Sequence, residues 1–455
     1  MTEVRKENKM GVMPVPKLLV TMALPMIASM MVQALYNIVD SIFVAQLNED
    51  ALTAVSLAFP VQNLMIAVAA GTGVGINALL SKSLGEKDYD GANRIAQNGI
   101  LLGILSSIVF AVLGIIGSKA FFEIQTSDSD IIRYGTEYMS VITIVSVGIF
   151  MQVTFERLLQ STGKTIFNMI TQGTGAIINI ILDPIFIFGW FGLPKMGVTG
   201  AAVATVSGQV IAALLGVYFN RKFNKEIHVT FRCFKPCKRT IGAIYKIGVP
   251  SIIMQAIGSL TTFGMNKILL AFTSTAATVF GVYFKLQSFI FMPVFGLTNG
   301  MIPIVAYNYG AKNKKRIYQT IKLSVAIAVG IMLVGVLIFQ IFPKTLLGLF
   351  EASDHMLAIG APALRIISLS FVFAGFCITI SCVFQALGNG IYSLIMSAAR
   401  QILVILPVAY VFGKLFGLNA VWYAYPIAEI VSVAVCIILL IRILNLKVRN
   451  LNGES

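Results

Sequence analysis

Charged residues are scarce in this sequence of 455 residues. Asp, Glu, Lys and Arg together make up 12% of it, whereas a water-soluble globular protein has roughly 25%. Hydrophobic residues account for 57%. With so few charges there is not enough polar surface to wrap a water-soluble core of this size. The composition therefore excludes a soluble globular protein and indicates a membrane protein.

Histidine and cysteine are also rare, which excludes most metal and catalytic sites. The sequence has two His, His228 and His355, and both fall in expected loops. Three of the five Cys lie in apolar segments, and Cys233 and Cys237 lie in a basic loop without a second ligand pair. No zinc centre or catalytic triad is predicted. We expect no enzyme activity, no cofactor and no resident metal.

One short motif resembles a nucleotide site but lacks a required residue. Gly163-Lys164-Thr165 matches the end of a P-loop, yet Leu158 stands where the motif requires a glycine. The sequence therefore predicts no ATP-driven transport. Energy for any transport must come from an ion gradient, in which one charge crossing 100 mV supplies about 2.3 kcal/mol.

Long hydrophobic runs, by contrast, recur along the whole chain. A helix needs about 20 mostly apolar residues to cross a bilayer. Runs of this length, separated by polar, Gly or Pro signals, predict an all-α integral membrane protein with twelve transmembrane helices. The expected spans are 16–44, 52–80, 94–117, 131–156, 164–188, 197–219, 241–271, 277–308, 316–341, 357–386, 391–416 and 419–445.

The net charge of +15 reflects topology rather than nucleic-acid binding. Of the 34 Lys and Arg, 25 fall on the side that would receive both termini and the even-numbered loops, and six fall on the opposite side. Positive charge accumulates in cytoplasmic loops. The asymmetry therefore predicts that both termini are cytoplasmic, in a multi-pass protein of the plasma membrane.

The sequence repeats itself after 225 residues. With this shift Pro25 meets Pro250, and six of the 21 glycines in the first half meet a glycine, where composition predicts roughly two. Each repeat holds six spans, so both halves enter the membrane in the same orientation. Two parallel six-helix lobes are an architecture of secondary transporters. We expect an N-terminal lobe at 1–219, a basic cytoplasmic linker at 220–240 and a C-terminal lobe at 241–455.

The first lobe contains two acidic residues within its spans. Asp40 and Asp183 are each expected about one turn from the outer end of an outward-running helix, with Asn179 one turn from Asp183. Two carboxylates in a poorly hydrated pocket create a proton site, and added oxygen ligands could hold sodium. Alternatively, each Asp only bonds a helix end. Polar groups that could converge on the same pocket are Tyr36, Tyr138 and Thr205.

Other charged positions allow two interpretations. Lys285 and Glu429 are expected at equal depth in the second lobe, where they are candidate partners, as is Arg400. They either form a structural pair or serve substrate binding or coupling. Glu156 and Arg157 are expected at a solvated helix end. Pro25 removes a backbone hydrogen bond in the first span, so it marks either a moving hinge or a static kink.

Five segments form a recognisable set: Asn-Ile-Ile-Leu-Asp-Pro-Ile-Phe-Ile-Phe-Gly at 179–189, Gly-Val-Thr-Gly-Ala-Ala-Val-Ala-Thr at 197–205, Ala-Leu-Pro at 23–25, Gly-Glu-Lys at 85–87 and Gly-Ala-Lys at 310–312. Together they resemble the multidrug and toxic compound extrusion (MATE) family, in particular its bacterial DinF/MepA-like branch. The resemblance covers essentially the whole chain. It implies two six-helix bundles that export organic cations in exchange for protons or sodium ions.

The resemblance also implies roles for individual residues. Its ion-coupling site falls on Asp40, Asn179, Asp183 and Thr205, with a carbonyl of Ala201 as an additional sodium ligand. Gln33, Tyr36 and Tyr138 match polar positions around that site, and Pro25 matches a bend in the first helix. Other branches place coupling acids in the second lobe, but this sequence has none at those positions. The first lobe is therefore the expected site.

These observations predict a monomeric secondary active multidrug exporter that works by alternating access. Its expected partners are cationic or amphipathic drugs and the lipid bilayer, with no nucleic acid. The alternative is a flippase or exporter of a lipid-linked or other endogenous metabolite on the same two-lobe fold. Such a protein favours a strongly cationic cavity, for which Lys267, Lys285 and Arg400 are the only hint.

Overall fold

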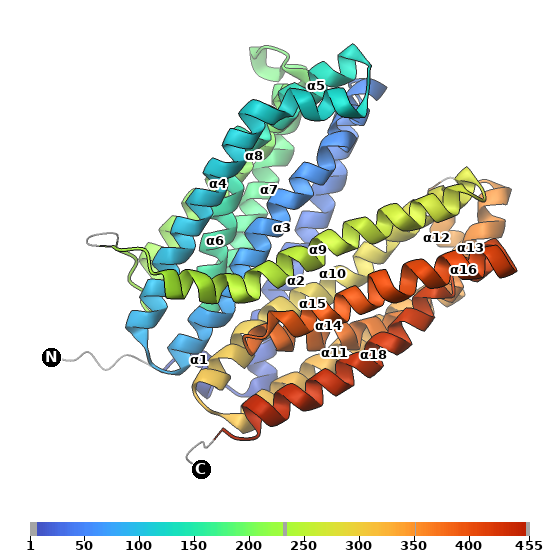
Figure 1. Ribbon diagram of the computed structural model, residues 1–455. Coiled ribbons are helices and arrows are strands. Elements are labelled where there is room, and N and C mark those ends of the chain that lie inside the picture. The colour runs from blue at the N-terminus through green and yellow to red at the C-terminus, as the bar shows by residue number, and fades with distance from the viewer. Residues whose placement is uncertain (1–6, 231–233, 351, 452–455) are drawn as a thin grey trace. The chain divides into compact units, whose positions relative to one another are not determined.

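The computed structural model describes residues 7–230, 234–350 and 352–451, and within these ranges it contains helices and connecting turns without any strand (Figure 1). The α-helices are α1 Lys9–Val12, α2 Val15–Ala45, α3 Glu49–Gly85, α4 Tyr89–Gln125, α5 Ser129–Ile144, α6 Val147–Ser161, α7 Thr165–Phe188, α8 Gly197–Phe223, α9 Lys238–Leu270, α10 Ser274–Gly310, α11 Lys314–Ile341, α12 Pro343–Gly348, α13 Asp354–Ser368, α14 Phe371–Ala386, α15 Gly390–Ala398, α16 Leu406–Phe416, α17 Leu418–Val421 and α18 Ala424–Ile443. A 3-10 turn covers Trp190–Gly192, and π-helical segments cover Ala399–Ile405 and Leu444–Val448.

The helices account for all twelve expected spans. Among the described residues, ten helices or helix runs are long and apolar enough to cross a membrane, and two bent helix pairs bring the number to twelve. Large apolar side chains also point outward, for example Ile115 and Ile116 on α4. Lipid, unlike water, covers such side chains without cost. The predicted class, an all-α multi-pass membrane protein, is confirmed.

The 225-residue repeat extends to the ends of the helices. Asn48 caps α3 by accepting a hydrogen bond from Ala51 N at 2.7 Å, and the repeat-related Thr273 caps α10. The left-handed backbone at Lys87, with φ of 60°, returns at Lys312, with φ of 56°. Each of the two side-chain caps, Asn48 and Thr273, contributes about 1 kcal/mol to the stability of its helix. The two halves therefore share their turn chemistry as well as their apolar pattern.

Two expected spans are bent rather than straight. The fourth is broken between α5 and α6 by 42°, and the tenth is broken between α13 and α14 by 48°. The breaks fall at Ser146 and Ser370, one residue out of register with the 225-residue repeat, and their hydroxyls donate to the carbonyls of Ser107 and Ile367. A polar side chain that bonds main-chain oxygen in this way competes with the helical ladder.

The chain packs as two compact units. One comprises residues 28–248 and the other comprises 1–27 together with 249–455. This division differs from the expected boundaries in the first helix of each repeat. The part of α2 up to Ile27 packs with the second repeat, and the linker and α9 up to Gly248 pack with the first.

Glycines explain why these first helices pack closely against the opposite repeat. A Cβ on Gly296 of α10 would lie 2.5 Å from the Cα of Ile27, and one on Gly300 would lie 2.8 Å from the Cα of Ala23. In the other unit, a Cβ on Gly75 of α3 would meet the backbone of Ile244. Small residues at such positions allow the backbones of two membrane helices to approach closely.

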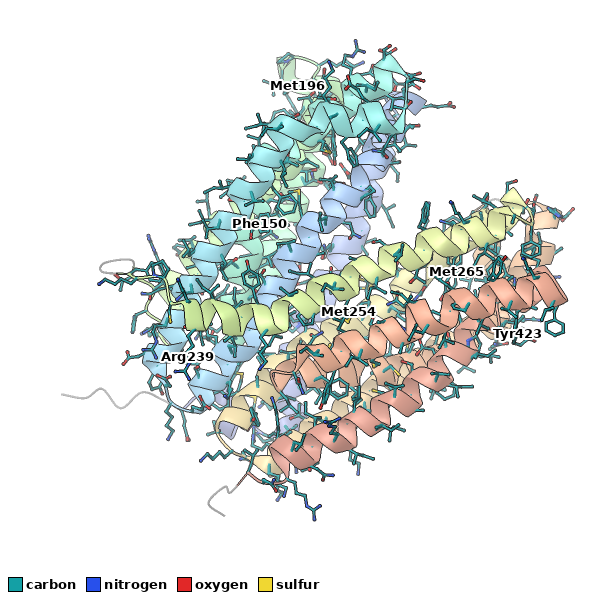
Figure 2. All side chains as sticks on the ribbon, viewed as in Figure 1. Phe150, Met196, Arg239, Met254, Met265 and Tyr423 are labelled. Atoms are coloured by element: carbon teal, nitrogen blue, oxygen red, sulfur yellow. The ribbon has the colours of Figure 1, made fainter. Side chains whose placement is uncertain are left out.

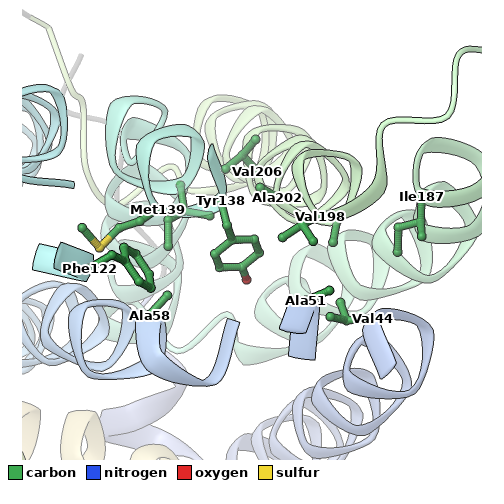
Figure 3. Close-up of a cluster of buried hydrophobic side chains, with 12 residues drawn as sticks. Val44, Ala51, Ala58, Phe122, Tyr138, Met139, Ile187, Val198, Ala202 and Val206 are labelled. Carbon is green, nitrogen blue, oxygen red and sulfur yellow. The ribbon is translucent and has the colours of Figure 1, made fainter. Parts of the chain in front are cut away.

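Each unit has its own apolar interior. In the unit of residues 28–248, Phe150 of α6 (Figure 2) packs with Met65, Ala69 and Phe110 in one buried cluster. A second cluster lies where α2, α3, α4, α5, α7 and α8 approach one another (Figure 3). It contains Val44, Ala51, Ala58, Phe122, Tyr138, Met139, Ile142, Ile187, Val198, Ala201, Ala202 and Val206.

Candidate ion-coupling site

The α7 helix carries an acidic residue into the interior of the unit formed by residues 28–248. Asp183 is 0% exposed and Asn179, one turn earlier, is 2% exposed. With the Asn179 amide oriented to satisfy both neighbours, its nitrogen donates to Asp183 Oδ2 at 3.3 Å and its oxygen accepts from Thr205 Oγ1 at 3.2 Å. Three of the four residues expected in the ion site are therefore joined, across α7 and α8.

The α2 helix brings the second carboxylate to the same place. Gln33, Tyr36 and Asp40 share one face of α2 because they are spaced by three and four residues. Gln172 Nε2 of α7 donates to Gln33 Oε1 at 2.9 Å. Further along the same two helices, the rings of Phe43 and Phe188 meet edge to face with centroids 6.5 Å apart.

These two contacts fix how α2 and α7 run alongside each other. Asp40 lies between Gln33 and Phe43 on α2, and Asp183 lies between Gln172 and Phe188 on α7. Both carboxylates therefore lie between the same two contacts of α2 with α7, and their charges act on each other.

Two tyrosines complete the cluster. Tyr36 and Tyr138 both lie within electrostatic range of Asp40 and Asp183. Tyr138 is 1% exposed, and its hydroxyl accepts a hydrogen bond from Gln62 Nε2 of α3 at 2.8 Å. Its ring lies among the apolar side chains of the second cluster (Figure 3). The polar groups therefore border an apolar cluster on the side of Tyr138.

The oxygen atoms of this cluster are of the kind that bind small cations. Asp40 Oδ1 is buried and has no hydrogen-bond partner among the described residues. Two charged carboxylates in such surroundings repel each other, and a bound proton or metal cation relieves the repulsion. The carboxylate, amide and hydroxyl oxygens are hard donors that suit sodium. Within the described ranges no group of three His, Cys, Asp or Glu could hold a transition metal.

Ala201 and Pro25 stand apart from this hydrogen-bonded set. Ala201 of α8 is fully buried one turn from Thr205, and its carbonyl is the ligand that the family resemblance implied. Pro25 lies buried inside α2, fifteen residues before Asp40. It deprives the carbonyl of Thr21 of its usual helical partner. A weak point in the helical ladder therefore precedes the carboxylate on the same helix.

In the other unit, Glu429 has a different partner from the one expected. Glu429 Oε1 accepts from Arg400 Nη1 at 2.8 Å, in a pair whose side chains are 7% and 23% exposed. Arg400 lies in the π-helical segment Ala399–Ile405. Lys285 is exposed, with its ammonium 5.9 Å from the centre of the Phe350 ring. The expected pairing of Lys285 with Glu429 is replaced by one with Arg400, which the sequence offered as the other candidate.

Comparison with known proteins decides the family. The MatE family model matches residues 25–185 and again residues 250–411, so it begins at Pro25 and at its repeat partner Pro250. The chain belongs to the MATE family. The two matches, 225 residues apart, bear out the internal repeat.

Curated relatives and solved structures agree with this MATE assignment. The multidrug export protein MepA of Staphylococcus haemolyticus is 28% identical over 417 residues, which cover 91% of each chain. The outward-facing structure of a multidrug resistance MATE family transporter of the MOP superfamily has a TM-score of 0.91 at 26% identity, covering 97% of this chain and 99% of that one. A MATE structure in the bent conformation has a TM-score of 0.89 at 27% identity, covering 95% and 96%.

The expected environment of Glu156 in this MATE chain is wrong. Glu156 was expected to be solvated at a helix end, yet it is 8% exposed. Gln152 Nε2 and Thr171 Oγ1 donate to its Oε1 at 3.0 and 3.3 Å. One of these donors comes from the preceding turn of α6 and the other from α7, and the contact with α7 leaves no mark in the local sequence pattern.

The basic loop of this MATE chain contains one cysteine that the structure places. Cys237 is a free cysteine, and its backbone N–H donates to Asn98 Oδ1 of α4 at 3.0 Å. Hydrogen bonds with Thr240 lower the pKa of the Cys237 thiol below its ordinary value. Cys233, considered with it as a zinc ligand, lies outside the described residues.

Proposed function

We propose that this MATE-family protein exports cationic or amphipathic organic compounds and takes up protons or sodium ions in exchange. The observation that carries the proposal is the meeting of Asp40 and Asp183 with the bonded pair Asn179 and Thr205. The curated relatives named multidrug export proteins support the substrate class. The oxygen-only donor set supports a proton or sodium as the coupling ion.

In the proposed cycle, an ion from outside binds between Asp40 and Asp183 and removes their repulsion. The helix α2 then bends where Pro25 interrupts its hydrogen bonds, and the bend expels the bound compound. The ion drives this change only to the extent that it binds one state better than the other. Similar MATE structures, one described as bent and one as straight, support a change of this kind.

We further propose that the protein works as a monomer in the plasma membrane with both termini in the cytoplasm. The distribution of 25 cations against six supports this orientation. The structure adds no support for the alternative function as a lipid flippase. Arg400, one of its three hinted cations, is held by Glu429, and Lys267 lies over the Phe263 ring.

The test is ethidium efflux from proteoliposomes under separately imposed pH and sodium gradients. Asp40→Asn and Asp183→Asn, folded and inserted like wild type, should each lose gradient-driven efflux by at least about ten-fold. Glu137→Gln is the matched control, because Glu137 is an exposed acid of the same unit that bonds Thr199 instead. Full activity in both Asp variants would remove the coupling mechanism.

A further inference from the structure

Glu156 is a buried carboxylate that the ion site described above does not use. Its two donors, Gln152 and Thr171, are neutral. The charged group that acts on it is Arg157, its immediate neighbour in α6. Adjacent residues on a helix do not face each other, and Arg157 Nη1 donates to Gln160 Oε1 at 2.6 Å.

Burying an acidic side chain without a charged partner is costly, so a residue of this kind in a membrane protein is a candidate for an ion or substrate path. A purely structural role is served as well by a neutral glutamine, which accepts the same two hydrogen bonds. The presence of an acid at position 156 therefore points to a cation that it binds during the cycle.

The α7 helix connects Glu156 to the cluster around Asp40 and Asp183. Polar residues follow one face of α7 at spacings of four, seven and four, and they are Asn168, Gln172, Asn179 and Asp183. Thr171, which holds Glu156, borders this face. Thr171 and Asp183 are twelve residues apart, which corresponds to about 18 Å along the helix. Glu156 thus lies beside the same helix as Asp183, but nearer its other end.

The α2 helix carries polar groups at two matching positions, one near Thr171 and one near Asp183. Gln33 bonds Gln172, which adjoins Thr171, whereas Asp40 lies seven residues further along, beside Asp183. Tyr36 lies between them on the same face. Two helices of one unit therefore present polar side chains along the length that separates the two acidic levels.

We propose that Glu156 is a second binding station for the coupling cation, which passes between the Asp40–Asp183 cluster and Glu156 on its way through the unit of residues 28–248. This inference rests on the proposed exchange function. The ligand is a proton or a sodium ion, held by the carboxylate with the Thr171 hydroxyl and the Gln152 amide. The polar face of α7 and its partner face on α2 line the route between the stations.

The experiment uses full-length protein in proteoliposomes, with ethidium as the transported probe and separate pH and sodium gradients. Glu156→Gln keeps both hydrogen bonds but removes the charge. We expect it to lose uphill transport by at least ten-fold under the gradient that drives wild type. Ethidium–ethidium exchange without a gradient should stay within about two-fold of wild type, which a damaged fold would not allow.

Several outcomes separate this inference from the proposed function. If wild type and Asp183→Asn behave as proposed but Glu156→Gln transports uphill like wild type, the second station is wrong and the exchange function stands. If wild type moves no ethidium under either gradient, the proposed function itself fails. Glu137→Gln serves again as the acid that should be replaceable without loss.

A second variant covers the case in which Glu156→Gln does not fold. Thr171→Val leaves the carboxylate in place but removes the hydroxyl, which lies 3.3 Å from Glu156 Oε1 and also donates to the Asn168 carbonyl at 2.9 Å. It should raise the ion concentration for half-maximal transport at least three-fold, with the maximal rate kept within two-fold. A stable Thr171→Val protein with an unchanged ion dependence would overturn the proposal.

Discussion

At the scale of single residues, a few hydrogen bonds between oxygen-bearing side chains hold the acidic cluster in place. Asn179 links Asp183 of its own helix to Thr205 of the neighbouring helix α8. The amide therefore fixes where the Asp183 carboxylate points before any ion arrives. Such preorganisation lowers the free energy that ion binding must spend on ordering side chains.

Replacing Thr205 tests this arrangement. Thr205→Val has nearly the same shape but loses the hydroxyl, whereas Thr205→Ser keeps it. Because a hydrogen bond of this kind contributes about 1 kcal/mol, Thr205→Val should raise the ion concentration for half-maximal ethidium transport about five-fold. Thr205→Ser should stay close to wild type. Equal ion dependence in the two variants would contradict a role for the hydroxyl.

The thiol of Cys237 provides a prediction outside the membrane spans. Because hydrogen bonds with Thr240 lower its pKa, the reactive thiolate forms at lower pH than in an ordinary cysteine. The alkylation rate of Cys237 by iodoacetamide, followed by peptide mass spectrometry, should therefore reach half its maximum at a lower pH in wild type than in Thr240→Val. Identical pH profiles for the two proteins would show that Thr240 does not stabilise the thiolate.

At the scale of helices, glycines decide which helix approaches which. The α10 helix packs against the first part of α2 because Gly296 and Gly300 offer no side chain there. Both glycines have repeat partners, Gly71 and Gly75, in α3, and Gly75 meets the backbone of α9. The same packing rule therefore places the first helix of each repeat against the second helix of the other.

Gly300→Ala should destabilise the protein because its new Cβ would lie 2.8 Å from the Cα of Ala23, a backbone atom that cannot move alone. Overpacking of this kind costs about 1–3 kcal/mol. Gly330→Ala on α11 is the matched control, since a Cβ there meets nothing within 4 Å. Thermal unfolding of the detergent-solubilised proteins should rank Gly300→Ala below wild type and Gly330→Ala at or above it. The opposite ranking would exclude close packing as the reason for Gly300.

The sequence was informative wherever a pattern repeats or a group is costly to bury. Apolar length located all twelve spans, and the 225-residue shift located the two halves. The helical spacing of Asn179 and Asp183 indicated their shared face. The bends at Ser146 and Ser370 were missed, because a serine inside an apolar run carries no mark of its main-chain bond. The burial of Glu156 was missed because its partner Thr171 lies on another helix, a contact that the local sequence does not show.

At the scale of the whole molecule, the direction of insertion decides which end of the proposed ion path faces outside. The proposed orientation places the linker around Cys237 in the cytoplasm and the turn between α7 and α8 outside. Lys195 in that turn is exposed, so a cysteine there is open to labelling. These two positions lie in loops at opposite ends of α8, and they report on opposite sides of the membrane.

In intact cells, a membrane-impermeant maleimide should therefore label Lys195→Cys in a background with Cys233→Ser and Cys237→Ser, and should leave wild-type Cys237 unlabelled. In inside-out vesicles the pattern should reverse, because the cytoplasmic face is then exposed to the reagent. The background without the two loop cysteines is the control for labelling at the remaining cysteines. Labelling of Cys237 in intact cells would place the linker outside and invert the path, so that the ion would reach Glu156 before Asp40 and Asp183.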